Sequence, residues 1–100
     1  MNLEERIETF SELGQILRDG LAGKKGRYGE ALERLVAEQQ FRNGWFTPRN
    51  VEQALRAIAE VLTTGKLAIW TGRYPEISEQ HEPSDVAVVM AGNIPLAGFH

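Results

Sequence analysis

The chain has 100 residues, enough for one small domain, and its 42% hydrophobic and 25% charged residues are typical of a globular protein. Its net charge is −3 and its longest basic tract is Lys24-Lys25, so a nucleic-acid-binding function is disfavoured. Because the chain has no cysteine, a disulfide framework and a thiolate metal site are excluded.

The first segment is predicted to form an amphipathic helix. Asn2 and Glu5 have the spacing of a capping box, with Asn in place of the usual Ser or Thr. Apolar residues then recur every three or four positions and share one helical face: Leu3, Ile7, Phe10, Leu13 and Leu17. Four glycines and three cations follow between residues 20 and 29, and this composition predicts a loop.

Three further helices are predicted. The second covers residues 28 to about 41 and is ended by Asn43-Gly44. Its inward-facing residues are predicted to be Tyr28, Leu32, Leu35 and Val36. The third has the clearest start signal in the chain, since Thr47 is a good N-cap and Pro48 occupies the first helical position. Its predicted buried stripe comprises Val51, Leu55, Ile58 and Leu62, with the end of the helix at Gly65 and a short fourth helix over residues 66–71.

The character of the sequence changes after a polar connection over residues 76–84. Residues 85–91 form a run rich in β-branched side chains, bounded by Pro83 and Gly92. Polar and apolar residues do not alternate there, which predicts a strand buried on both faces, as in a parallel sheet. The predicted fold class is therefore α/β, with about four helices over residues 1–84 and a first parallel strand within residues 85–100. Since no second convincing strand is present, we expect the natural protein to continue beyond His100.

Asn93 lies in a Gly-Asn-x-Pro turn directly after this predicted strand. In open parallel sheets, ligands bind beyond the carboxyl ends of the strands, and Pro95 favours an extended conformation for Ile94. An amide at this position could donate a hydrogen bond into such a crevice. Asn is also a common turn former, so from the residues alone a purely structural role for Asn93 is favoured.

Two stretches of the sequence resemble a known family. Residues 90–96, Met-Ala-Gly-Asn-Ile-Pro-Leu, are similar to the Asn-x-Pro-Leu motif that ends the first cofactor-domain strand of aldehyde dehydrogenases. Together with the following Gly98-Phe99-His100, they resemble the branch of long-chain acyl-CoA reductases known from bacterial luminescence. The helical region is similar as well, above all residues 43–51, Asn-Gly-Trp-Phe-Thr-Pro-Arg-Asn-Val.

The resemblance implies an oxidoreductase that uses NAD(P)H, commonly NADPH, to reduce an acyl-CoA or acyl-protein thioester to a fatty aldehyde through a cysteine acyl-enzyme. Asn93 matches the family asparagine whose amide binds the oxyanion. Met90, Ala91 and Gly92 match the backbone stretch that passes the cofactor, at the start of a Rossmann-like domain over residues 85–100. The nucleophilic cysteine and most of that domain are absent from these residues, so the chain alone is expected to be inactive.

Other signals in the sequence are weaker. The loop around Lys24 could hold a phosphate, but it lacks the Gly-Lys-Ser/Thr ending of a P-loop, and a solvated loop is favoured. His81 and His100 have no partners at metal-ligand spacing, so no metal site is predicted. Four aromatic residues could line an acyl pocket, although packing in the helical core is favoured for them: Trp45, Phe46, Trp70 and Tyr74.

The alternative function is that of a non-enzymatic helical protein-interaction module. Its amphipathic helices would offer a groove, and residues 86–99 would add as an edge strand to a partner. The sequence has neither the signature of a signal peptide nor an apolar run of membrane-spanning length, so we expect a cytoplasmic location without a membrane span. A homo-oligomer is compatible with either function.

Overall fold

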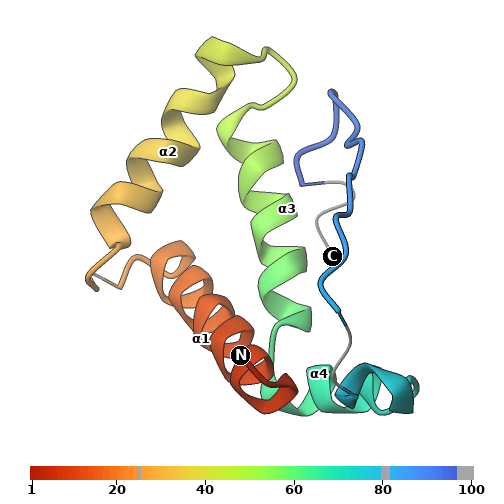
Figure 1. Cartoon of the computed structure of the whole chain (residues 1–100). Coiled ribbons are helices and arrows are strands. Elements are labelled where there is room, and N and C mark those ends of the chain that lie inside the picture. The colour runs from red at the N-terminus through yellow and green to blue at the C-terminus, as the bar shows by residue number, and fades with distance from the viewer. Residues whose placement is uncertain (25, 80–81, 97–100) are drawn as a thin grey trace.

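The computed structural model describes residues 1–24, 26–79 and 82–96. Within these ranges the chain forms four α-helices, α1 (Leu3–Leu21), α2 (Gly29–Arg42), α3 (Pro48–Val61) and α4 (Thr64–Thr71), followed by the short 3-10 helix η1 (Pro75–Ser78). Helix α1 packs against α2, α3 and α4, and residues 82–96 run beside α3 on the side away from α2 (Figure 1). The architecture is therefore an open helical layer with an extended C-terminal strap.

Both ends of α1 are closed by local chemistry. The Asn2 side chain accepts a hydrogen bond from the Glu5 amide and the Glu5 carboxylate accepts one from the Asn2 amide, both at 2.8 Å, which confirms the predicted capping box. At the other end, the Gly23 amide donates to the Gly20 carbonyl and the Lys24 amide to the Asp19 carbonyl, with Gly23 at φ 75°. This pair of bonds is a Schellman motif, so α1 ends at Leu21 instead of before Gly20.

The start of α3 is as predicted, whereas the boundary between α3 and α4 is not. The Thr47 hydroxyl accepts a hydrogen bond from the Asn50 amide at 3.2 Å, and Pro48 lies in the first turn. The Thr63 hydroxyl likewise accepts a hydrogen bond from the Lys66 amide, also at 3.2 Å. Because an N-cap residue must be extended, Thr63 ends α3 before Gly65 and starts α4 at Thr64.

The core is small and lies where α1 crosses α3. Two of the residues predicted to face inward from α2, Tyr28 and Leu35, are 46% and 52% exposed, so that part of the prediction was wrong. Helix α2 buries only Val36, and the Arg27 guanidinium lies over the Tyr28 ring, 5.3 Å from its centroid. The buried residues among those described are Gly14, Leu17, Val36, Val51, Ala59, Leu62 and Thr71.

The molecule is thin for its length. Its extents are 42 × 30 × 19 Å, and its radius of gyration is 15.4 Å, against about 13 Å for a compact domain of this size. Its solvent-accessible surface is 8119 Å², whereas a compact monomer of 11.2 kDa exposes about 5700 Å². Much apolar surface therefore stays in contact with water. None of the helices in the described ranges is long and apolar enough to cross a bilayer.

Arg18 joins α1 to the C-terminal end of α3. Its Nη1 atom donates hydrogen bonds to the carbonyls of Ala59 and, at 3.3 Å, Leu62. The last carbonyls of a helix have no partner within the helix, and a cation beside them also interacts favourably with the helix dipole. Arg18 thus caps α3 from a neighbouring helix.

Replacing this cap should measurably destabilise the fold. In Arg18→Met the aliphatic stem remains, but the Ala59 and Leu62 carbonyls lose a charged donor, so we expect the free energy of unfolding to fall by about 1–2 kcal/mol. Urea denaturation followed by circular dichroism measures the change. Arg34→Met on the exposed face of α2 is the matched control, and equal losses in the two variants would contradict the capping role.

The predicted parallel strand, and with it the α/β fold class, is wrong for this structure. The described residues contain no strand, and residues 82–91 are extended but exposed. Val86 and Val89 are 83% and 98% exposed. A strand is defined by hydrogen bonds to a neighbouring strand, and no described segment lies in position to supply them. The sequence property that predicted the strand, a run of β-branched residues, does not create a sheet without that partner.

Candidate functional site

An apolar cleft lies beneath the C-terminal strap, in the part of the chain that the structure describes. It has a volume of about 1090 Å³ and lies between α3, α4 and the turn formed by residues 93–96. Its polar lining residues are Asn50, Gln53, Lys66 and Asn93. Its apolar lining residues are Phe10, Ala54, Ala57, Ile58, Val61, Leu62, Leu67, Trp70, Ile94, Pro95 and Leu96.

Helix α3 forms one wall of the cleft with a face that the sequence prediction did not single out. Ala54, Ala57 and Val61 share this face and line the cleft, next to Ile58 from the predicted buried stripe. Alanine side chains leave room between the helix and the strap. The signal available in the sequence was the strong amphipathicity of this helix, whose apolar side is wider than one row of large residues.

The turn that closes the cleft is tied to the connection between α2 and α3. Asn43 donates from Nδ2 to the Gly92 carbonyl at 2.7 Å, and its Oδ1 accepts a hydrogen bond from the Trp45 amide at 3.0 Å. Asn50 in turn donates to the Trp45 carbonyl at 2.9 Å. Leu96 adopts φ 59°, a left-handed conformation that is unfavourable for a residue with a branched side chain. The position of Asn93 therefore depends on contacts made by residues 43–50.

Asn93, the predicted oxyanion-binding residue, lies at the rim of this cleft with its side chain exposed. Its amide, which carries two N–H donors, makes no hydrogen bond to any residue in the described ranges. Two of the other polar lining residues already have partners, since Asn50 donates to the Trp45 carbonyl and the Lys66 ammonium donates to the Glu60 carbonyl at 2.9 Å, whereas Gln53 has none among the described residues. Chemically, the site is an apolar trough lined by two amides, those of Asn93 and Gln53, that make no hydrogen bond within the described residues.

Met90, Ala91 and Gly92, the predicted cofactor-binding residues, lie on the exposed strap just before this turn. The Gly92 carbonyl is occupied by Asn43, and a Cβ added at Gly92 would meet nothing within 4 Å. Lys66 is the one cation that lines the cleft, and no glycine-rich turn leads there into a helix N-terminus. The described residues therefore do not by themselves form a site for a nicotinamide dinucleotide.

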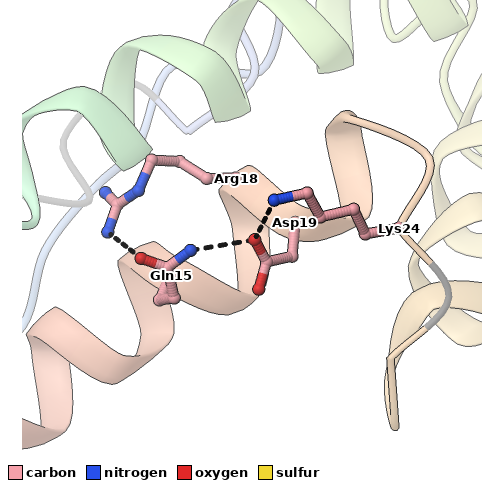
Figure 2. A network of polar contacts seen from close by, with 4 residues as sticks. All are labelled: Gln15, Arg18, Asp19 and Lys24. Carbon is pink, nitrogen blue, oxygen red and sulfur yellow. Dashed lines mark hydrogen bonds and ion pairs between the residues drawn. The ribbon is translucent and has the colours of Figure 1, made fainter.

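Lys24, in the loop that the sequence offered as a possible phosphate-binding site, pairs with Asp19 of α1. Arg18 donates to Gln15 at 3.2 Å, Gln15 donates to Asp19 at 2.8 Å, and the Lys24 ammonium lies 3.8 Å from Asp19 (Figure 2). The Lys24 side chain is 73% exposed, so this ion pair contributes little. This agrees with the solvated loop favoured from the sequence.

The remaining candidates do not form a second site in the described ranges. His81 and His100 lie outside the described residues, and the described residues contain no group of three potential metal ligands.

The aromatic residues are less buried than core packing requires: Trp45 is 65%, Trp70 51% and Tyr74 49% exposed. Trp70 lines the cleft instead. The sequence prediction that these three residues pack in the core was therefore wrong.

Comparison of the chain with protein-family profiles, with curated proteins and with solved structures gave no match.

Proposed function

We propose that this chain provides the acyl-binding cleft and one oxyanion donor, Asn93, of an NAD(P)H-dependent acyl-CoA reductase. The observation that carries the proposal is the placement of a free amide at the edge of an apolar cleft of about 1090 Å³. A fatty acyl thioester has the complementary form, a long apolar chain joined to one strongly polarised carbonyl. The resemblance of residues 90–96 to the family motif supports the same assignment.

The apolar wall would contribute binding energy. Each methylene of an acyl chain that leaves water for the surface formed by Ala54, Ile58 and Val61 is worth about 0.8 kcal/mol. Burial of several methylenes holds the chain, and burial of the thioester beside it removes water from the carbonyl. A drier environment strengthens every hydrogen bond made to that carbonyl.

Asn93 would act on the carbonyl oxygen. When a thiolate attacks the thioester, negative charge develops on that oxygen, and an amide N–H held at hydrogen-bond distance stabilises the charge. The chain has no cysteine, so the thiolate has to come from residues outside these 100. The nicotinamide cofactor, commonly NADPH in the family that the chain resembles, supplies hydride and would likewise bind outside them.

A direct test uses the protein as its own source produces it. We expect this protein to oxidise NADPH only when a long-chain acyl-CoA is added, with one aldehyde formed per NADPH consumed. Absorbance at the NADPH band and aldehyde trapping measure the two quantities. An intact mass near the 11.2 kDa of these residues, together with no thioester-dependent oxidation, would contradict the proposal.

A second candidate function, a non-enzymatic interaction module, is favoured by the surface of the chain. The exposed surface of 8119 Å² and the thin helical layer are typical of a chain that completes its packing against a partner. The same assay separates the two candidates, because a module without the reductase activity would leave NADPH unchanged.

A further inference from the structure

We infer that the apolar cleft binds an acyl chain in one direction, with its carbonyl beside Gln53 and Asn93 and its tail toward Trp70, so that the wall formed by α3 limits the length of the chain. This inference rests on the acyl-binding part of the proposed function and not on the reduction step. It adds a binding role for Gln53 and a length-selecting role for Ala57.

One continuous stripe of α3 lines the cleft, and its polarity changes along the helix. The stripe consists of six residues that share a helical face: Asn50, Gln53, Ala54, Ala57, Ile58 and Val61. Its first two members carry amides, and the four that follow are apolar. A ligand that lies along this stripe is therefore matched when it has a polar group at one end and an apolar chain behind it.

The polar end of the cleft is the end where the strap turns. The hydrogen bond of 2.7 Å from Asn43 to the Gly92 carbonyl holds this turn beside the connection that precedes α3, so Asn93 lies near the first turns of that helix. Gln53 belongs to those turns, and neither amide has a partner among the described residues. Because a carbonyl oxygen has two lone pairs, one acyl carbonyl can accept a hydrogen bond from each wall of the cleft.

The opposite end of the cleft is closed by apolar groups from α1 and α4. Phe10 comes from α1, and Leu67 and Trp70 come from α4, which packs against α1 where α3 ends (Figure 1). Lys66 also lies at this end, but its ammonium already donates to the Glu60 carbonyl. A neutral thioester carbonyl gains less from a cation than a carboxylate does, so this end favours the tail of an acyl thioester.

The distance between the two ends limits the length of the chain that fits. Gln53 and Leu62 are nine residues apart, which corresponds to about 14 Å of helix. An extended dodecanoyl chain has a similar length, whereas an octanoyl chain ends well short of Trp70. Ala57 lies between the two ends, and its small side chain leaves room for the tail to pass.

The test measures the binding of neutral thioesters to the 100-residue chain. Octanoyl and dodecanoyl thioesters of N-acetylcysteamine are titrated into Trp45→Phe, in which Trp70 is the remaining tryptophan. We expect only the dodecanoyl thioester to shift the Trp70 emission to shorter wavelength, because only its tail covers this ring, which is 51% exposed. In calorimetric titrations it should bind about a hundredfold more tightly, since each further buried methylene raises the affinity about fourfold.

Two substitutions test the two ends of the cleft separately. In Ala57→Phe the two thioesters should bind within about threefold of each other, because both tails meet the new ring and the extra methylenes stay in water. Arg56→Phe, exposed on α3 and outside the lining, is the matched control and should keep the hundredfold difference. Gln53→Leu should raise both dissociation constants about fivefold, since a hydrogen bond to the shared carbonyl is lost, whereas Gln40→Leu on α2 should change neither.

The outcomes separate this inference from the proposed function. An equal shift of the Trp70 emission by both thioesters, or tighter binding by Gln53→Leu, would place the carbonyl at the wrong end and overturn the inference while leaving an acyl-binding cleft. A hundredfold difference that survives in Ala57→Phe would overturn the length-selecting role. If neither thioester binds, the acyl-binding cleft and this inference both fail. Binding as described, without thioester-dependent NADPH oxidation by the protein as its own source produces it, would overturn the reductase proposal alone.

Discussion

Gly14→Ala should unfold the chain at a temperature about 10 °C or more below that of the unchanged protein, although alanine is the better helix former. Helix α1 approaches the end of α3 at Gly14 so closely that an added Cβ would lie 2.7 Å from Leu62 Cβ and still nearer to the Leu62 carbonyl oxygen. These are backbone and first side-chain atoms, which cannot move aside alone. Overpacking of this kind costs about 1–3 kcal/mol, and about 1 kcal/mol shifts the melting temperature of a small domain by 4–8 °C.

Whether Gly14→Ala lowers or raises the melting temperature shows if the two helices approach each other closely at this residue. Without the close approach, the intrinsic preference for alanine over glycine would stabilise α1 by about 1 kcal/mol. Gly65→Ala in α4 is the matched control, since a Cβ there meets nothing within 4 Å and the melt should be unchanged or higher. A Gly14→Ala protein as stable as this control would show that α1 and α3 do not cross at Gly14.

The parts of the fold that were predicted correctly are those that depend on neighbours in the sequence. Asn2 with Glu5, and Thr47 with Pro48, fix helix starts through bonds that reach three residues along the chain. Thr63 caps α4 by the same chemistry, and the signal was present in the sequence. It was missed because Gly65 two residues later was interpreted as the end of the preceding helix.

The parts that were not predicted depend on residues distant in sequence. Arg18 reaches the carbonyl of Ala59, 41 residues away, and no local pattern identifies such a partner. The cleft likewise arises because residues 93–96 lie over α3. Composition did identify residues 85–91 as an unusual segment, but whether such a segment becomes a strand is decided by what lies beside it.

Asn93→Ala should lower the kcat of thioester reduction by about a hundredfold or more in the protein as its source produces it, because an oxyanion donor acts mainly in the transition state. KM should change little, since the ground-state carbonyl is weakly held by the same amide. Steady-state kinetics with a long-chain acyl-CoA measures both constants. The Asn93 side chain makes no hydrogen bond to the described residues, so its removal should leave the melting temperature unchanged.

Gln40→Ala is the matched control for Asn93→Ala, because it also removes an exposed amide, but from α2 and away from the cleft lining. Its kcat and melting temperature should equal those of the unchanged protein. Unchanged turnover in Asn93→Ala would remove Asn93 from the chemistry. A parallel fall in turnover and melting temperature would mean that Asn93 holds the turn over the cleft, which is the structural role that the residues alone favour. A fall in kcat at constant stability is the one result that a turn-forming residue would not produce.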